Sequence, residues 1–441
     1  MTETGATTPA TQGIRARVMR VLAVNRVTEL VRAAELDGRL LAMVVTLIAI
    51  EIGFGIYTGG SILSPVNVLT FVTQAIEIAI LATGMVLVIV SRNIDLSVGS
   101  VVAVVAMVYA VLMHEIYPTT IGVNTPYGWL LALGIGIALG MFLGGIQGFL
   151  IAYAKIPSFV VTLGGLLAFR GLVFDISGGS TQAPDDKQFV TIGGGPLGSL
   201  GGSLSWVLGA ILAVTIVLYL WYNRRRRRKF GFPVRPLVAE VAVAVASILI
   251  VVGAVLVSNS YHWPIGLIKQ YAADHNISPV GLDFEAGVPW PAVILLVVAV
   301  GMTFLATKRK FGRYVYAIGG NPDAAELGGI NTRWTIMKIY ILMGFLCAIA
   351  AAISSAQING ATNDLGQGYE LLVISAAVIG GTSFAGGIGT IPGAVLGAIV
   401  IYAVRYNLQY VGLPSNNQDI VVAAVLVSAV AFDTYSRRRS T

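Results

Sequence analysis

The chain has 441 residues, of which 56% are hydrophobic and only 11% are charged, with a formal net charge of +7. Soluble domains carry about 25% charged residues, so a chain of this length has too few charges to cover a water-facing surface. The composition excludes an ordinary soluble protein and predicts one that faces lipid. The single cysteine, Cys347, excludes an intrachain disulfide or a multi-cysteine metal site, and we interpret it as a small core residue.

The first 39 residues contain no stretch long enough to cross a membrane. Residues 1–12 are polar, and residues 13–39 mix arginines with isolated aliphatic residues. Such a pattern is typical of a helix that lies on a membrane surface. We predict no signal peptide and interpret residues 1–39 as a basic, cytoplasmic N-terminal extension.

Long apolar stretches then recur to the end of the chain. A helix needs roughly 20 mainly apolar residues to cross the hydrocarbon layer, and lipid offers no partners for an irregular backbone. The sequence therefore predicts an all-α polytopic membrane helical bundle, with about twelve (10–12) transmembrane helices, in a single transmembrane domain at residues 40–436 and a basic tail at 437–441. The predicted spans lie near residues 40–57, 72–91, 98–117, 128–154, 156–177, 204–222, 237–258, 289–307, 335–358, 371–387, 393–409 and 418–432.

The basic residues are distributed asymmetrically about these spans. With the N-terminus inside, most of the 28 lysine and arginine residues fall in cytoplasmic segments, and only Lys187 and Lys269 fall outside. This bias is what the positive-inside rule predicts, so both termini are expected to be cytoplasmic. The basic run at residues 224–229 has the pattern of a nucleic-acid patch, but between two spans it is better interpreted as a topological anchor, with no nucleic-acid partner.

A polar turn at residues 91–97 separates the second and third predicted spans. It is either a tight cytoplasmic loop or a broken helix inside the bundle, and in both cases Asp95 can pair with Arg92. Ionisable residues in spans mark transport pathways by default, with pairing or snorkelling as the structural alternative. Other polar residues in or near spans raise the same question: Glu51, Gln74, Glu77, Gln147, Arg170, Asp175, Lys338 and Arg405.

Two glycine patterns stand out within the spans. The uncharged span at residues 128–154 carries glycines spaced by four, which places them on one helix face and allows a neighbouring helix to approach closely. Residues 380–397 hold so many glycines, with Pro392, that we predict a helix break followed by a restart. Either pattern indicates helix packing or a gate. The glycines concerned are Gly136, Gly140, Gly144, Gly148, Gly380, Gly381, Gly386 and Gly387.

A short capped helix is encoded within residues 319–331. Asn321 is a good N-cap, Pro322 suits the first helical position, and Asp323 complements the positive end of the helix dipole. Gly328 or Gly329 can end the helix in the left-handed conformation. So short a helix has little stability of its own, so it is expected to dock on a cytoplasmic partner, with a helix lying on lipid as the alternative.

No signature of catalysis is present. The phosphate-binding loop requires Gly-Lys followed by Ser or Thr, and no lysine of this chain follows a glycine. The three histidines lack metal-ligand spacing, and no nucleophile–base pair can be proposed. We therefore predict no enzyme activity, no cofactor and no metal, with any ATP hydrolysed by another chain.

Three stretches resemble motifs of the sugar permeases in the ribose/xylose branch of ATP-binding-cassette importers. They are Ser-Arg-Asn-Ile-Asp-Leu-Ser-Val-Gly-Ser at 91–100, Tyr-Ala-Ile-Gly-Gly-Asn-Pro-Asp-Ala-Ala at 316–325 and Ile-Gly-Gly-Thr-Ser-Phe-Ala-Gly-Gly-Ile-Gly at 379–389. Residues 157–171 resemble the xylose-type permeases in particular, and residues 223–288, with an extra span, are similar to an insertion in that type.

The resemblance implies a permease subunit in the cell inner membrane that moves a monosaccharide from periplasm to cytoplasm, with D-xylose as the first candidate. It implies a homodimer of two permease copies, ATP-binding subunits docked on a coupling helix within 319–331, and a periplasmic sugar-binding protein on the outer loops. The residues that match the coupling motif are Asn321, Pro322, Asp323, Ala324, Ala325, Glu326 and Gly329. The polar candidates for lining the pathway are Asn93, Asp95, Ser97, Gln147 and Ser375.

Other classes remain open at this point. An ion-gradient-driven secondary sugar transporter would use ionisable residues such as Glu51 and Glu77, usually in two related halves, but no matched halves are visible. An ATP-driven exporter would lack the binding-protein partner. A polytopic membrane enzyme is disfavoured because no cluster of His, Asp or Cys is present.

Overall fold

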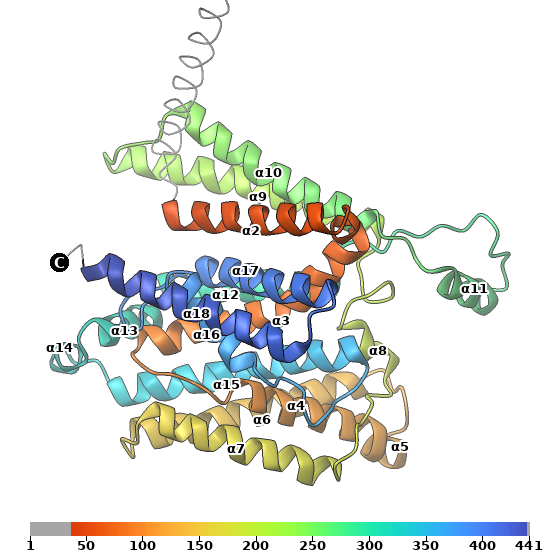
Figure 1. Ribbon diagram of the computed structural model, residues 1–441, viewed down its shortest axis with the longest axis horizontal. Coiled ribbons are helices and arrows are strands. Elements are labelled where there is room, and N and C mark those ends of the chain that lie inside the picture. The colour runs from red at the N-terminus through yellow and green to blue at the C-terminus, as the bar shows by residue number, and fades with distance from the viewer. Residues whose placement is uncertain (1–36, 439–441) are drawn as a thin grey trace, which may run out of the picture. The chain divides into compact units, whose positions relative to one another are not determined.

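The computed structural model describes residues 37–438, and almost all of its regular structure is helical (Figure 1). Besides helices, this part of the chain contains three isolated bridges between loop residues. The predicted extension at 1–39 lies outside the described residues except for 37–39, as do residues 439–441 of the predicted tail. The helices are α2 (Gly38–Tyr57), η1 (Ser61–Leu63), α3 (Pro65–Val90), α4 (Val98–Val111), η2 (Leu112–Ile116), α5 (Tyr117–Thr120), α6 (Gly128–Ala152), α7 (Ser158–Ser177), α8 (Lys187–Thr191), α9 (Gly202–Lys229), α10 (Leu237–Asn259), α11 (Ile265–Asp274), α12 (Trp290–Lys308), α13 (Lys310–Gly320), α14 (Pro322–Leu327), α15 (Thr332–Ile358), α16 (Tyr369–Ile379), α17 (Ile391–Tyr410) and α18 (Ser415–Arg438).

The described chain forms two compact units. The smaller unit contains most of α9 and α10, residues 206–256, with the first residues of α2. Within it α9 and α10 form a helical hairpin, closed by an ion pair between Arg224 and Glu240 and by a hydrogen bond from Arg224 to the Arg235 carbonyl at 3.0 Å. The larger unit contains the remaining helices and all the motifs that resemble the sugar permeases.

Ten of the described helices are long and apolar enough to cross a membrane, which confirms the predicted polytopic helical bundle. The stretch predicted as a span at 371–387 does not form one long helix. Its helical part, α16, has 11 residues and is roughly 16 Å long, about half the thickness of the hydrocarbon layer. The last predicted span lies within α18, a helix of 24 residues.

The predicted helix break is confirmed between α16 and α17. Helix α16 ends at Ile379 and α17 begins at Ile391. Between them the backbone takes positive φ at Gly381, Gly386 and Gly387, a conformation that glycine adopts without a steric cost. Gly380, Thr382, Ser383 and Gly389 of this segment are buried in protein, where non-helical backbone at membrane depth is tolerated, whereas Phe384 and Ile388 are exposed.

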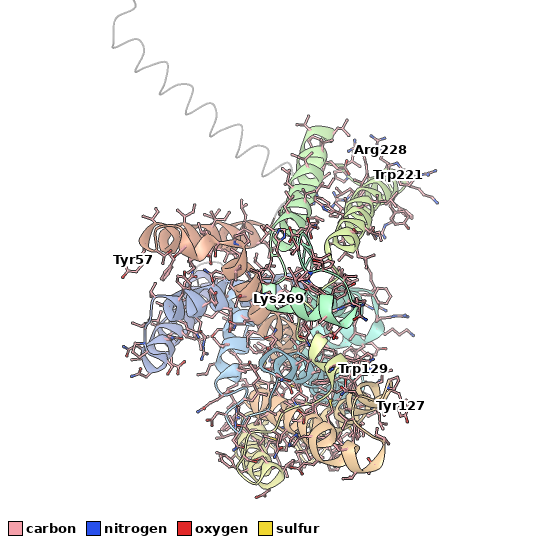
Figure 2. The ribbon with its side chains drawn as sticks, turned by 90° about the vertical axis from the view of Figure 1, so that its right-hand side faces the viewer. Tyr57, Tyr127, Trp129, Trp221, Arg228 and Lys269 are labelled. Carbon is pink, nitrogen blue, oxygen red and sulfur yellow. The ribbon has the colours of Figure 1, made fainter. Side chains whose placement is uncertain are left out.

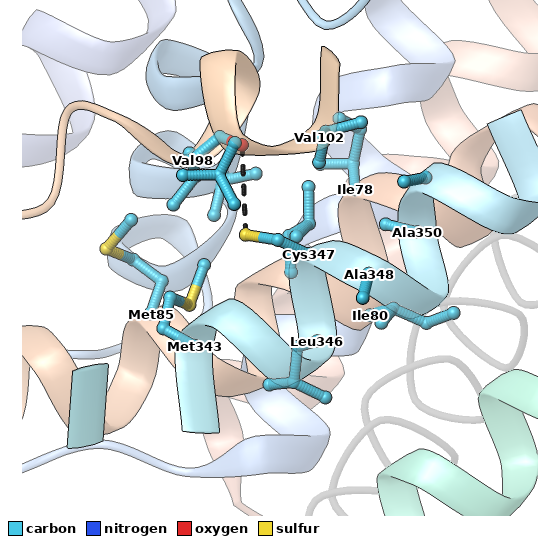
Figure 3. Packing of buried hydrophobic residues seen from close by; sticks show 14 of the residues in the cluster. Ile78, Ile80, Met85, Val98, Val102, Met343, Leu346, Cys347, Ala348 and Ala350 are labelled. Atoms are coloured by element: carbon cyan, nitrogen blue, oxygen red, sulfur yellow. Dashed lines mark hydrogen bonds between the residues drawn. The ribbon is translucent and has the colours of Figure 1, made fainter. Parts of the chain in front are cut away.

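The core of the larger unit lies where α3, α4 and α15 meet (Figure 1). Helix α3 is buried continuously from Ala75 to Val90, as expected for a helix that is apolar on all sides. Cys347 of α15 is a core residue, as predicted. It is 1% exposed, and its Sγ lies 3.7 Å from the Val98 carbonyl oxygen of α4 (Figure 3).

Helix α6 packs on α15 through the predicted glycine face. A Cβ atom at Gly140 would lie 2.4 Å from the Gly344 carbonyl oxygen, and one at Gly144 would lie 2.2 Å from the Tyr340 carbonyl oxygen. Gly148 faces Met337 in the same way, whereas Gly136 faces the ring of Tyr109 on α4. Lipid provides no hydrophobic force between helices, so close backbone approach of this kind holds them together.

Replacing Gly144 with valine should therefore destabilise the helix pair, because the new side chain meets backbone that cannot move aside. We expect a loss of about 1–3 kcal/mol, seen as a lower unfolding temperature of the detergent-solubilised protein. Gly134→Val is the matched control, since Gly134 lies on the same helix with nothing within 4 Å of its Cβ position. Equal unfolding temperatures for the two variants would contradict the packing role of the glycine face.

Candidate functional site

Helix α14 has the caps that the sequence predicts. The Asn321 side chain accepts a hydrogen bond from the Ala324 N–H at 3.0 Å, and Pro322 occupies the first turn. Gly329 takes the left-handed conformation, with φ of 82°, and the Ile330 N–H closes the end on the Ala325 carbonyl. A bulky residue at Gly329 would therefore strain the helix end in addition to changing its surface.

The two sides of α14 differ in exposure. Ala325 is buried, whereas Asp323, Ala324 and Glu326 are exposed. The next residue, Leu327, is 91% exposed, the highest value among the exposed large hydrophobic residues of the described chain. Leu327 was not among the residues predicted to couple to a partner. Its position could have indicated it, because it is a leucine at the end of a short helix whose other exposed residues are small or acidic.

Helix α14 begins directly after α13, and the end of α13 is held by Arg92. The Arg92 side chain donates from Nε to the Gly319 carbonyl and from Nη2 to the Gly320 carbonyl, each at 2.8 Å. The last carbonyls of a helix lack intrahelical partners, so a guanidinium group satisfies them well. Arg92 itself has a positive φ of 63°, and it follows directly on the end of α3.

The segment between α16 and α17 also contacts the ends of α3 and α13, where Arg92 lies. The Gly387 N–H donates to the Val90 carbonyl at 2.9 Å. A Cβ atom at Gly319 would lie 1.8 Å from the Val90 carbonyl oxygen, and one at Gly386 would lie 2.6 Å from the Arg92 side chain. We call this contact of residues 90–92, 319–320 and 386–387 the three-segment junction.

Gly380 and Gly381 lie elsewhere, at the start of the break. A Cβ atom at Gly380 would lie 2.5 Å from the Gly393 carbonyl carbon, so Gly380 allows the end of α16 to cross α17 closely. Of the four glycines predicted here for packing or a gate, only Gly386 and Gly387 are brought to the three-segment junction.

Three of the predicted pathway residues form one buried cluster. The Ser97 Oγ donates to Asp95 Oδ1 at 2.6 Å, and the Ser97 N–H donates to the same oxygen at 2.9 Å. Gln147 of α6 donates from Nε2 to Ser97 Oγ at 2.8 Å. Asp95, Ser97 and Gln147 are each 3% exposed or less. The cluster joins the polar turn to α6.

The expected pairing of Asp95 with Arg92 is wrong. Arg92 bonds to carbonyls at the end of α13 instead, and Asp95 has no ion pair in residues 37–438. Burial raises the pKa of the Asp95 carboxyl above its usual range, and the hydrogen bonds from Ser97 oppose that shift.

The other two predicted pathway residues do not join this cluster. Asn93 donates to the Ser91 carbonyl and to Ser91 Oγ, within the turn itself. Ser375 is fully buried and donates to the Leu371 carbonyl of its own helix. The five residues therefore lie in three separate places, the cluster, Asn93 and Ser375, and their role in a pathway stays a prediction.

Three ionisable residues within the spans, two acidic and one basic, also have hydrogen-bond partners. The Tyr369 hydroxyl donates to Glu77 at 2.6 Å, and Asn407 donates to Glu51 at 3.2 Å. Arg170 donates to the carbonyls of Asn363 and Leu365 at 3.0 and 2.7 Å. Each of these residues thus has neutral hydrogen-bonding partners within the protein, which explains its presence in a span without a bound proton or sodium ion.

A cavity of about 200 Å³ with a mixed polar and apolar lining lies at the N-terminal end of α3. Hydroxyl and amide groups line much of it, and none of the five predicted pathway residues contributes. The lining residues include Thr70, Thr73, Gln74, Ser199, Tyr261 and Gln357. Sequence reasoning missed most of this set because its members come from four distant segments. Within the described residues, no group of three or more His, Cys, Asp or Glu side chains could hold a metal ion.

Comparison with known proteins gives one consistent family. The family described as "Branched-chain amino acid transport system / permease component" matches residues 67–235 and 230–430. The xylose transport system permease protein XylH of Escherichia coli (strain K12) is 35% identical over 407 residues, which are 92% of this chain and 94% of that protein. The chain belongs to this permease family.

Other relatives are permeases as well. XylH of Haemophilus influenzae is 35% identical over 90% of this chain and 96% of its own length. The ribose import permease protein RbsC of Escherichia coli (strain K12) is 28% identical over 83% of this chain and 85% of its own length. No solved structure matches. This permease is a multi-pass protein of the inner membrane: its apolar helices account for the multiple passes, and its membership of the permease family accounts for the inner membrane.

Replacing Arg92 with alanine should loosen the end of α13, because the Gly319 and Gly320 carbonyls lose a charge-assisted partner. Such bonds contribute about 1.5–3 kcal/mol each, so amide hydrogen exchange over residues 317–325 should rise at least about fivefold by mass spectrometry. Arg333→Ala is the control, since the exposed Arg333 makes no side-chain hydrogen bond in the described chain. Unchanged exchange in the Arg92 variant would mean that other contacts hold the junction.

Proposed function

We propose that this chain is the membrane-spanning permease subunit of an ATP-driven importer that moves a monosaccharide from periplasm to cytoplasm. D-xylose is the first candidate for that monosaccharide. The observation that carries the proposal is the 35% identity to XylH over 92% of the chain. The three motifs at 91–100, 316–325 and 379–389 support it, because residues of all three meet in space at the three-segment junction.

The cytoplasmic ATP-binding subunit docks on α14 in this proposal. The exposed side of α14 combines two carboxylates, Asp323 and Glu326, with the apolar Leu327. A complementary partner surface would present an apolar pocket with basic groups at its edge. Asn321, Pro322 and Gly329 set the two ends of the helix. The small side chain of the exposed Ala324 allows a partner protein to approach the helix backbone closely.

Movement of α14 reaches the membrane core through the three-segment junction. Arg92 joins the base of α14 to the end of α3, and Gly387 joins the end of α3 to the break before α17. The turn after Arg92 is fixed in turn by Asp95, Ser97 and Gln147. These contacts support a positioning role for the cluster in transmitting a rigid-body change between two states.

Further partners follow from the same proposal. A periplasmic sugar-binding protein would contact the outer segments, residues 178–201 and 260–289, which contain α8 and α11. The cavity near Thr73 and Gln357 lies beside these segments and offers hydroxyl and amide groups to a sugar. A second copy of the chain would complete the pathway.

The ion-driven alternative has less support. It requires accessible ionisable residues at membrane depth. Glu77 is buried against Tyr369, and Glu51 is bonded to Asn407. If a separate subunit hydrolyses ATP, this chain needs only a surface on which that subunit can dock, and the capped and exposed α14 offers one.

Uptake of labelled D-xylose should be lost when the gene is deleted and restored when the intact chain is supplied. It should fall after ATP depletion and persist after the ion gradients are collapsed. Dependence on the gradients would instead identify a secondary transporter. Loss of a different sugar in a competition panel would retain the mechanism and replace the substrate.

Replacing Leu327 with aspartate should abolish uptake, because a charge would occupy the apolar part of the docking surface. Leu327 is 91% exposed, so the unfolding temperature and membrane insertion should not change. Leu327→Met keeps the size and apolar character and should keep at least about half of the uptake. Full uptake with the aspartate variant would remove α14 from the docking surface.

A further inference from the structure

A basic and aromatic pocket lies on the α9–α10 hairpin, and none of its lining residues belongs to the candidate functional site. It has a volume of about 1180 Å³ and lies entirely within the smaller unit. Four basic side chains line it together with four aromatic ones. They are Arg225, Arg226, Arg227, Lys229, Trp221, Tyr222, Phe230 and Phe232.

The position of the pocket along α9 corresponds to the surface of a membrane. The body of α9 is apolar up to Tyr222, and the helix then continues through the basic run to Lys229. At 1.5 Å per residue these last seven residues extend roughly 10 Å beyond the apolar body, which is enough to cross a head-group layer of about 5–8 Å. Trp221 and Tyr222 occupy the level that aromatic residues prefer at an interface.

Three of the basic residues in the pocket have no acidic partner in the described part of the chain. The single acidic neighbour, Glu240, pairs with Arg224, which does not line the pocket. Arg225 lies over the Trp221 ring at 5.4 Å, and Arg225, Arg226 and Lys229 have no acidic partner among residues 37–438. The aromatic side chains are widely exposed, between 56% and 64%. The pocket thus offers cations and apolar surface side by side.

We propose that this pocket binds the head group of an anionic phospholipid in the leaflet that the hairpin meets. Arginine forks bind phosphate oxygens in a bidentate manner, and clustered basic residues next to a transmembrane helix attract anionic lipids. The exposed aromatic rings would contact the glycerol and the first acyl carbons. A phosphate without acyl chains would leave those rings in water, so the mixed lining specifies a lipid.

The chain supplies a matched pair of variants. Arg226 lines the pocket, whereas Arg228 is an exposed arginine of the same run that does not line it. Figure 2 shows Arg228 and Trp221 at the same end of α9. Arg226→Gln and Arg228→Gln remove the same charge two residues apart, so they separate binding in the pocket from general attraction to the surface.

Native mass spectrometry of the full-length protein in detergent would measure the apparent Kd for phosphatidylglycerol, with phosphatidylcholine of identical acyl chains as the neutral reference. We expect tighter binding of phosphatidylglycerol, a Kd raised about fivefold by Arg226→Gln and about tenfold or more by R225Q/R226Q, and less than a twofold change for Arg228→Gln. The variant R225K/R226K keeps the positive charge and the topology, and should bind more weakly than the unaltered protein but more tightly than R225Q/R226Q.

Several results would overturn the proposal. Equal effects of Arg226→Gln and Arg228→Gln would indicate general surface charge. Displacement of the lipid by millimolar inorganic phosphate would indicate a free-anion site, and tighter binding of a short single-stranded oligonucleotide that depends on Arg226 would indicate nucleic acid. Thermal unfolding of each variant provides the folding control, and a lipid effect that follows the unfolding temperature rather than the pocket would also reject it.

Discussion

The hydrogen bonds from Arg92 to the Gly319 and Gly320 carbonyls are the contacts on which the rest of the structure depends. The free carbonyls at a helix end need partners, and at α13 a single guanidinium group supplies two of them. Helix α14 begins at Pro322, two residues after α13 ends at Gly320, so the end of α13 sets the direction of α14. The same arginine follows the last turn of α3, which is buried continuously from Ala75 to Val90. A helix too short to be stable alone is thereby tied to the rigid centre of the bundle.

Glycine makes this contact possible by allowing backbone to meet backbone. At the three-segment junction Gly319 faces the Val90 carbonyl, and Gly387 donates to it. The same principle joins α6 to α15 through Gly140 and Gly144. In lipid, where apolar side chains gain nothing by meeting, close approach of this kind is the main source of helix association. Segments joined through backbone move together, because no flexible side chain lies between them to absorb a displacement.

The sequence predicted those features that depend on neighbours along the chain. The apolar stretches gave the spans, the spacing of glycines gave the face of α6, and the caps of α14 followed from Asn321 and Gly329. The sequence could not predict contacts between distant segments. Asp95 was expected to pair with Arg92 because the two are three residues apart, yet Arg92 bonds to carbonyls 227 and 228 residues away. Which polar residues meet is decided by tertiary packing, so Asp95, Ser97 and Gln147 came together while Asn93 and Ser375 did not.

Two sets of groups that face water on the permease have opposite charge and different surroundings. The exposed side of α14 carries Asp323, Glu326 and Leu327 and no basic residue. The α9–α10 hairpin carries arginines among exposed aromatic rings and a single acidic residue, which is already paired. A surface of the first kind repels an anionic bilayer and favours a basic protein partner, whereas the second kind favours the bilayer itself. The exposed carboxylates of α14 therefore disfavour contact with anionic head groups, which supports the proposed docking of a basic partner surface on this helix.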